Sequence, residues 1–299
     1  MHHPPHLTNP TRACGSSKVF PVGLGGMLLS IEGRPDRVRA TATIHTALDA
    51  GVTLIDSASA YHTGADEVGH NETLIADALE SWDGDAAAVT VVTKAGRVRP
   101  GDGRWLTDSS PDHLVRSAAA SRDRLRLDRI ELFFLHAPDP VVPIADSLTA
   151  LLRLVADGTV TSVGVSNVTV AELDLAHELL GDALVAVQNE FSPSAVQHRA
   201  VLRRAEELGL AFLAWRPLGT IGTKDDELTA AFTDIGRAHD ASAQRTALSW
   251  LLSTSPALIP IPGARRPETI LDSARAAELH LGQAEVSRLD AAVASRVPS

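Results

Sequence analysis

The segment VTLIDSASAY, residues 52–61, begins as a mostly apolar run and continues into polar residues. A strand that is covered on both faces shows no alternation of polar and apolar residues, because neither face meets water. Residues 52–55 fit that description, Asp56 follows them directly, and Tyr61 comes shortly afterwards. The segment therefore predicts a buried parallel strand that presents an acid at its carboxyl end and a phenol just beyond it.

Runs of the same kind recur along the chain, each bounded by turn residues and followed by a segment with helical periodicity. The other runs are FPVGLGGM, AVTVVTKA, RIELFFLHA, VTSVGVSN, ALVAVQNEF, LAFLAWRP and ALIPIPG. The segments between them carry helix signals too. Residues 36–51 end at Gly51, a plausible stop, and residues 109–125 have Ser110 as a candidate N-cap followed by Pro111.

Eight strand and helix pairs in a chain of 299 residues, without a linker-like change in composition, favour an α/β fold of the (β/α)8 or TIM barrel type. An open, doubly wound sheet is the alternative, since strands are being counted from a single sequence. We expect one domain over residues 18–299, preceded by a flexible tail over residues 1–17. Segments 96–110 and 219–242 are expected to be long loops that serve as lids or binding loops.

The composition excludes several classes of function. A net charge of −10 without a basic run disfavours a nucleic-acid partner, and no apolar stretch is long enough to span a membrane. The first residues lack the pattern of a secretory signal, so we expect a cytoplasmic protein. The single cysteine, Cys14, is expected to be an inert surface thiol in the tail. The twelve histidines form no metal-binding motif, and we expect no metal.

Three successive apolar runs end in ionisable residues that can take part in catalysis, namely Asp56, Lys94 and His136. Because the catalytic groups of a barrel come from the carboxyl ends of its strands, we expect these residues to meet Tyr61 at one rim. Each has an ordinary structural explanation alone, but their convergence favours catalysis. We expect Lys94 to bring the pKa of Tyr61 towards neutrality, Asp56 to hold the Lys94 ammonium, and His136 to orient a substrate carbonyl.

Seven motifs in order extend this pattern over about residues 19–295 and closely resemble the aldo-keto reductase family. They are LIDSASAY, VVTKAG, LFFLHAPDP, VGVSN, VQNEFS, AWRPLG and PIPGARRPE. The resemblance implies an NADPH-dependent reductase in which a tyrosine protonates the carbonyl oxygen while the nicotinamide delivers hydride to carbon. Tyr61, Asp56, Lys94 and His136 match the catalytic tetrad of that family.

The resemblance also implies a cofactor site. Ser166, Asn167 and Gln188 would hydrogen-bond the nicotinamide carboxamide. Trp215 would stack on the nicotinamide ring. Residues 216–224 would surround the pyrophosphate, and residues 263–273 would hold the 2′-phosphate and adenine. Loops after the seventh and eighth strands of barrels often bind phosphate, which agrees independently. The implied cofactor residues are Gly25, Gly26, Met27, Asp56, Ser166, Asn167, Gln188, Trp215, Arg216, Pro217, Leu218, Gly219, Lys224, Ile261, Gly263, Ala264, Arg265, Arg266, Thr269, Asp272 and Ser273.

One part of this implied site departs from the family. Where many members have an arginine followed by glutamate and asparagine, this chain has Thr269, Asp272 and Ser273. Arg265 and Arg266 still suit a phosphate, because a planar guanidinium can donate two parallel hydrogen bonds. NADPH is therefore favoured, with NADH as the less favoured cofactor.

The substrate itself is less constrained than the cofactor. A small-molecule carbonyl compound is the expected partner, with His62, Trp105, Phe191 and Met27 as candidates to line its pocket, and the sequence predicts no oligomeric state. Two other functions stay open. Lys94 could form a Schiff base in an aldolase, or the chain could be a non-catalytic NADPH-binding module that senses redox state.

Overall fold

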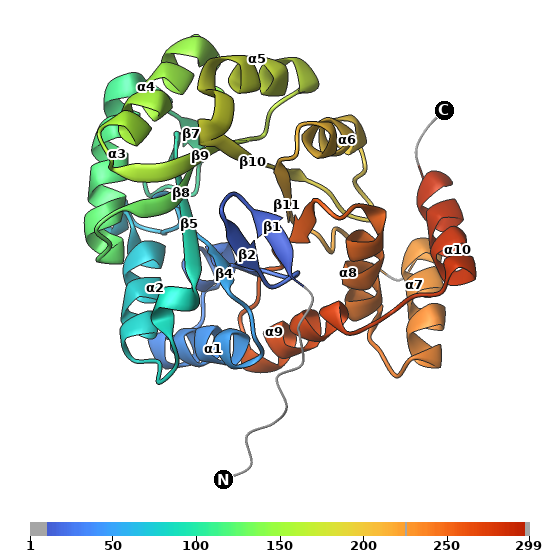
Figure 1. Ribbon diagram of the computed structural model, residues 1–299. Helices are drawn as coiled ribbons and strands as arrows, with labels where there is room; N and C mark the ends of the chain where they lie inside the picture. The colour runs from blue at the N-terminus through green and yellow to red at the C-terminus, as the bar shows by residue number, and fades with distance from the viewer. Residues whose placement is uncertain (1–10, 225, 297–299) are drawn as a thin grey trace.

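The computed structural model describes residues 11–224 and 226–296. Its main sheet has eight parallel strands in the order β12, β11, β10, β9, β8, β5, β4 and β3. The chain at the two outer strands of that order also meets, because Gly23 N donates to Pro260 O and Gly25 N donates to Pro262 O, both at 2.9 Å. The sheet thus closes into a barrel, and Figure 1 shows the helices arranged around it.

Each strand of the barrel coincides with one of the eight apolar runs. The strands are β3 (Leu24–Gly25), β4 (Leu54–Asp56), β5 (Thr90–Ala95), β8 (Ile130–Leu135), β9 (Val160–Ser166), β10 (Leu184–Glu190), β11 (Ala211–Trp215) and β12 (Leu258–Pro260). Their apolar side chains are buried on both faces, as the absence of polar alternation predicts. The expected (β/α)8 barrel is confirmed, and the open sheet is not.

Helices follow every strand and form the outer layer. They are α1 (Arg37–Asp49), α2 (His70–Glu80), α3 (Pro111–Leu125), α4 (Ile144–Ala156), α5 (Val170–Leu180), α6 (Arg199–Glu207), α7 (Glu227–Ala238), α8 (Ala243–Thr254), α9 (Pro267–Ala274) and α10 (Gln283–Ala294). Within the described ranges, none of them is both long and apolar enough to cross a membrane.

The helix ends follow the local sequence signals. Pro111 occupies the first turn of α3, where its missing N–H costs no helical hydrogen bond. Thr169 and Glu172 form a reciprocal capping box at the start of α5. Gly51 follows α1 with a φ of 91°, in the left-handed region that favours glycine at a helix end.

The two expected long loops contain secondary structure. Segment 96–110 includes a short antiparallel hairpin of β6 (Arg97–Val98) and β7 (Leu106–Thr107). Most of the described part of segment 219–242 is helix α7, which packs beside α10. The sequence does carry a signal for this helix, because Leu228, Phe232 and Ile235 recur at the spacing of one helical face and Asp226 caps its start.

A second hairpin lies where the sequence suggested a tail. Strands β1 (Arg12–Cys14) and β2 (Ser17–Val19) pair antiparallel, and Figure 1 shows them across the middle of the ring of strands. The expected tail is therefore wrong for residues 11–17, and residues 1–10 lie outside the described part. The side chains of the hairpin pack on apolar residues inside the barrel. Arg12 fastens it, because its guanidinium donates to Leu258 O at 2.6 Å.

Cys14 is part of this hairpin and is buried, so the expected surface thiol is also wrong. Burial, with the nearby Glu131 carboxylate, raises the pKa of the Cys14 thiol to about 12. Since the thiolate is the reactive form, we expect no labelling of the folded protein by a thiol reagent at mildly alkaline pH and complete labelling after denaturation. Labelling of the native protein at the rate of a free thiol would contradict this.

Candidate active site

The ammonium of Lys94 lies at the centre of the candidate site. Its Nζ donates to Asp56 Oδ2 at 2.8 Å, to Ser57 O at 2.7 Å and to Tyr61 OH at 3.1 Å. The Lys94 side chain has no exposed surface, so these acceptors replace water for all three of its N–H groups. The structure thus brings together the acid, the amine and the phenol that the sequence placed at one rim.

Asp56 fixes this ammonium from the neighbouring strand β4. The carboxylate is almost fully buried, and its other oxygen, Oδ1, accepts a hydrogen bond of 2.8 Å from Gln188 Nε2. Gln188 stands on β10 across the barrel interior, so this hydrogen bond joins opposite sides of the barrel. Both carboxylate oxygens are held, so Asp56 keeps Lys94 in one position.

His136 completes the set from the end of β8. Its ring meets the Tyr61 ring edge-on, with 5.8 Å between the centroids. Burial first, and then the positive charges of Lys94 and Arg97, hold the pKa of His136 well below its usual value. The imidazole is consequently neutral at physiological pH, and its buried Nδ1 has no hydrogen-bond partner among the described residues. A neutral ring can donate one N–H to a ligand without carrying a charge.

The protonation of Tyr61 differs from the sequence-based expectation. Burial raises the pKa of Tyr61, and this outweighs the opposing effect of Lys94; the negative charge of Asp56 raises it further. The expectation that Lys94 brings this pKa towards neutrality is thus wrong for the chain without ligands. Desolvation dominates because the phenol is 6% exposed. At neutral pH Tyr61 therefore carries its proton.

Lys94 keeps its charge in spite of its burial. Burial by itself lowers the pKa of Lys94, but the Asp56 carboxylate and the Tyr61 oxygen together raise it above its usual value. An amine that forms a Schiff base must be unprotonated and free to attack. Lys94 is charged and bound on all sides, which argues against the aldolase alternative.

Trp105 forms one wall beside the side chains of Tyr61 and His136. Its ring lies edge-on to both Tyr61 and His136, with 6.4 Å between centroids in each case, and it is 38% exposed. The guanidinium of Arg99 stacks on its face, 4.8 Å from the centroid. Trp105, which the sequence suggested as a substrate contact, is therefore suitably placed for that role.

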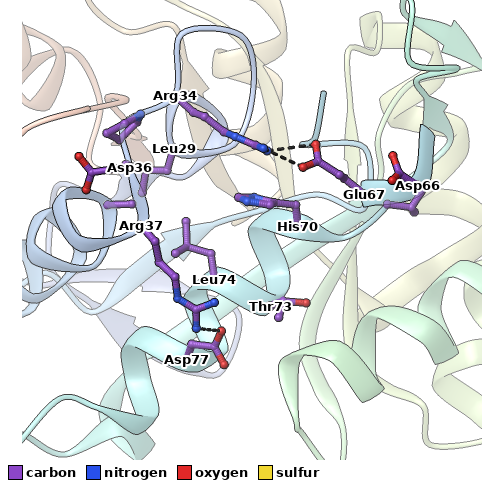
Figure 2. Close-up of a pocket in the computed structure, with 13 residues that line it drawn as sticks. Leu29, Arg34, Asp36, Arg37, Asp66, Glu67, His70, Thr73, Leu74 and Asp77 are labelled. Carbon is purple, nitrogen blue, oxygen red and sulfur yellow. Dashed lines mark hydrogen bonds and ion pairs between the residues drawn. The ribbon is translucent and has the colours of Figure 1, made fainter. Parts of the chain in front are cut away.

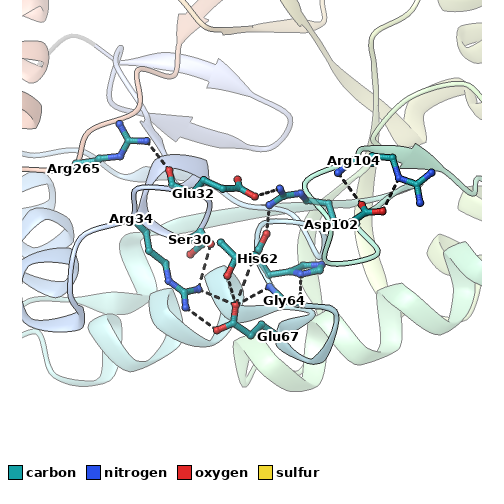
Figure 3. Close-up of polar contacts among 11 residues, drawn as sticks. Ser30, Glu32, Arg34, His62, Gly64, Glu67, Asp102, Arg104 and Arg265 are labelled. Atoms are coloured by element: carbon teal, nitrogen blue, oxygen red, sulfur yellow. Dashed lines mark hydrogen bonds and ion pairs between the residues drawn. The ribbon is translucent and has the colours of Figure 1, made fainter.

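Arg99 was not singled out from the sequence, yet it connects several loops at this rim. Its side chain is 1% exposed and donates to Glu32 Oε1 and to the carbonyl of His62. Figure 3 shows Glu32 also accepting a hydrogen bond from Arg265 through its backbone carbonyl, at 3.1 Å. Glu32 and Arg99 are 67 residues apart in loops, so no sequence signal indicates their pairing.

The other substrate candidates are placed less favourably. His62 is buried and its Nδ1 lies 2.7 Å from Gly64 O, so the ring is held by its own loop. Phe191 has no exposed surface and packs edge-on against Phe212 in the layer between strands and helices. Phe191 is therefore not accessible to a substrate. Met27 is 36% exposed and remains accessible.

The residues expected near the nicotinamide lie at the ends of β9 and β11. Asn167 adopts a left-handed φ of 60° and its Nδ2 donates to His136 O at 2.8 Å. Ser166 is buried beside it. Trp215 ends β11, and its Nε1 is buried without a hydrogen-bond partner among the described residues, as is Thr220 Oγ1. Buried polar atoms without partners are uncommon in proteins and indicate a missing ligand or water.

The glycines after β3 have a clear structural reason. A Cβ at Gly26 would lie 2.5 Å from Asn71 Oδ1, and a Cβ at Gly25 would lie 2.7 Å from Ile261 O. Barrel closure therefore needs glycine at position 25, and packing against α2 and β4 needs glycine at position 26, whether or not a cofactor lies nearby. Gly263 pairs with Gly25 across the closure.

Cations gather beyond β11 and β12, where phosphate groups were expected. Lys224, Arg265 and Arg266 are exposed, and Arg216 is exposed apart from a 3.4 Å contact with Glu190. After Arg216 the chain turns tightly at Gly219, whose φ is 55°. A Cβ at this position would collide with Ser192 and Ser194. The remaining expected residues of these turns are Pro217, Leu218, Gly219, Ile261 and Ala264, of which Pro217, Ile261 and Ala264 are buried.

Thr269, Asp272 and Ser273, which depart from the family pattern, form hydrogen bonds or an ion pair within the protein. Asp272 pairs with Arg245, whose Nε lies 3.0 Å from Oδ1. Ser273 is buried and donates to Thr269 O at 3.0 Å. Arg245 is thus a cation at this position that sequence reasoning missed. In the part of the chain that the structure describes, no group of three or more His, Cys, Asp or Glu side chains is arranged to hold a metal ion.

Comparison with known proteins agrees with this geometry. A model of the Aldo/keto reductase family matches residues 21–294. An uncharacterized oxidoreductase of Schizosaccharomyces pombe is 30% identical, over 92% of this chain and 87% of that protein. A second protein of that yeast, the aldo-keto reductase yakc, whose name specifies NADP(+), is 24% identical over 95% of this chain and 91% of its own. The solved structure of a glycerol dehydrogenase from Gluconobacter oxydans superposes with a TM-score of 0.84, at 25% identity over 98% of both chains.

Proposed function

This chain belongs to the aldo-keto reductase family, a family of oxidoreductases, and on that basis we propose that it uses NADPH to reduce an aldehyde or ketone to an alcohol. The observation that carries the proposal is the buried Lys94, which joins Asp56 to the hydroxyl of Tyr61. A structural ion pair would need no phenol, whereas a tyrosine acid needs a cation beside it.

In the proposed reaction Tyr61 is the general acid. Bound NADPH would be the source of the hydride. The Tyr61 hydroxyl would give its proton to the carbonyl oxygen as that oxygen gains negative charge. The Tyr61 oxygen is then left negative, and Lys94 Nζ at 3.1 Å stabilises that charge. The neutral His136 donates a hydrogen bond to the same carbonyl oxygen and orients it. Trp105 excludes water from one side of the substrate.

The residues beyond the tetrad suit a dinucleotide. The unpartnered Trp215 Nε1 and Thr220 Oγ1 follow β11, and exposed cations follow them, which supports an extended cofactor with its phosphates at this edge. Trp215 would contact the nicotinamide and Arg216 with Lys224 would hold the pyrophosphate. The yeast relative named for NADP(+) supports the phosphorylated cofactor over NADH.

The preference for NADPH gives a test of the two neighbouring arginines. Replacing both Arg265 and Arg266 by alanine should weaken NADPH binding by at least about tenfold, because charge-assisted hydrogen bonds to a phosphate are worth roughly 1.5–3 kcal/mol each. NADH binding should change little, since NADH lacks the 2′-phosphate. Tryptophan fluorescence titration with both cofactors measures the two affinities. Equal weakening of NADPH and NADH would mean that the 2′-phosphate lies elsewhere.

The proposed activity is tested by following NADPH absorbance with a broad panel of aldehydes and ketones. We expect oxidation of NADPH that needs both the carbonyl compound and an intact Tyr61. If NADPH binds but no compound on the panel causes oxidation above that of a Tyr61→Phe variant, the protein is a nucleotide-binding sensor rather than a reductase.

A further inference from the structure

A cavity of about 270 Å³ lies behind the loop that carries Tyr61, and we call it the arginine pocket. That loop, the β6 strand and helix α3 enclose it. Its lining residues are Ser59, Ala60, His62, Val68, Arg97, Val98, Arg99, His113, Arg116, Ser117, Ala120 and Arg124. No residue of the tetrad or of the expected cofactor site lines it.

The lining of the arginine pocket has one sign of charge. It includes four arginines and two histidines but no aspartate or glutamate, in a chain whose net charge is −10. Another cavity, between the start of α1 and helix α2, shows the ordinary case (Figure 2). There Arg34 pairs with Glu67 and Arg37 pairs with Asp77, both within the lining itself. The positive charge of the arginine pocket is therefore a local feature and not the trend of the protein.

Carboxylates outside the lining neutralise only part of this charge. Arg124 Nε donates to the buried Glu72 at 2.6 Å, and Arg99 pairs with Glu32. Arg97 donates to the Thr107 hydroxyl. Among the residues that the structure describes, neither Arg97 nor Arg116 forms an ion pair with a carboxylate. Asp108, which lies 3.5 Å from His113, is near enough to Arg116 for that arginine to lower its pKa, but it forms no ion pair with Arg116. Two guanidinium groups at this cavity are thus left without an ion-pair partner among the described residues.

Arg99 adds an observation that is independent of the charge count. Its side chain is 1% exposed, and its Nε is buried without a hydrogen-bond partner among the described residues. Leaving a charged donor buried and unpaired is costly, so such groups in proteins call for an explanation. An acceptor oxygen inside the pocket would supply the missing partner.

We propose that the arginine pocket binds a small multivalent oxyanion, at a site separate from the cofactor and the substrate. Guanidinium groups match phosphate and carboxylate oxygens through paired hydrogen bonds, and the pocket presents several of them. Its volume falls just below the range typical of small-molecule sites, which restricts the ligand to a compact one. A small phosphorylated or polycarboxylic metabolite has this chemistry.

Occupancy of the pocket would reach the catalytic site through the loop around Tyr61. Ser59, Ala60 and His62 line the pocket and flank Tyr61, and Arg99 donates to the His62 carbonyl. An anion bound to Arg99 would therefore fix this loop. Arg97 also lines the pocket and its charge acts on the pKa of His136, so an anion beside it would reduce that effect. The expected result is a change in turnover without a change in cofactor affinity.

Calorimetric titration of the NADP(+)-saturated protein tests the site, because the cofactor then occupies its own phosphate contacts. Inorganic pyrophosphate and citrate are the probes, and sodium chloride at matched ionic strength is the reference. We expect one site that binds at least one probe. Tighter binding of pyrophosphate would indicate a phosphorylated ligand, and tighter binding of citrate a polycarboxylate. Heat no greater than that of sodium chloride, from both probes, would overturn the proposal.

Variants of helix α3 provide the specificity control. Arg116→Glu reverses the charge of an exposed lining residue and should weaken binding of the probe at least about tenfold, with Arg116→Gln intermediate. Arg122→Glu introduces the same change on the same helix outside the lining, at a residue that pairs with Asp123, and should leave binding unchanged. Equal binding by the wild type and Arg116→Glu, or equal loss in both glutamate variants, would exclude the arginine pocket as the site.

Discussion

Replacing Tyr61 by phenylalanine should lower kcat for carbonyl reduction by at least about 100-fold, because a positioned general acid typically contributes 10²–10⁴-fold. The phenyl ring keeps the edge contacts with Trp105 and His136, so the site should retain its shape. Only the proton and the hydrogen bond to Lys94 are lost. The affinity for NADPH, measured by tryptophan fluorescence, should be nearly unchanged.

The proton state of Tyr61 can be measured directly, because it is the only tyrosine in the chain. Burial raises its pKa, so the ultraviolet signal of tyrosinate should appear only above about pH 10, the ordinary value for a phenol. The acid form would thus persist through the neutral and mildly alkaline range. Tyrosinate formation well below that pH would contradict the raised pKa of Tyr61. A Tyr61→Phe variant with wild-type turnover would exclude Tyr61 as the proposed acid.

A Lys94→Met variant should lose both activity and stability. The methionine fills most of the same volume, but Asp56 then keeps only the hydrogen bond from Gln188. Removing one partner of a buried ion pair costs roughly 3–5 kcal/mol, because the remaining charge is left uncompensated. The free energy of unfolding, from urea denaturation, should fall by about that amount. Turnover should fall as well, since no cation remains to stabilise the Tyr61 oxygen.

A double variant separates these two effects. Adding Asp56→Asn to Lys94→Met removes the uncompensated charge, so a large part of the lost stability should return. Activity should not return, because the ammonium beside Tyr61 is still absent. If Lys94→Met alone retains wild-type stability, the Asp56 carboxylate is not held as the structure indicates. If the double variant regains activity, Lys94 has no part in the reaction.

The barrel and the meeting of the tetrad could be predicted because both depend on local patterns. Each strand is an apolar run, and parallel strands bring the residues at their carboxyl ends to one rim. Asp56 and Lys94 follow that rule directly. The position of Tyr61 needed only the length of a short loop.

Features that depend on distant partners could not be predicted. The β1–β2 hairpin has no long apolar run, and its anchor Arg12 binds carbonyls at the other end of the chain. The pair of Glu32 and Arg99 joins two loops without a regular pattern. The direction of the pKa shift of Tyr61 depends on the balance between burial and a nearby cation, and the depth of burial is known only from the structure.

The hairpin of β1 and β2 has a consequence for biosynthesis. Arg12 and the carbonyl of Leu258 that it binds are 246 positions apart, so this contact waits until nearly all of the polypeptide has left the ribosome. Contacts between such distant positions form late, because a long segment must first be ordered. A nascent chain that ends before β12 therefore cannot form this contact, and the apolar residues that the hairpin covers inside the barrel stay exposed to water. Chaperones should retain such truncated chains.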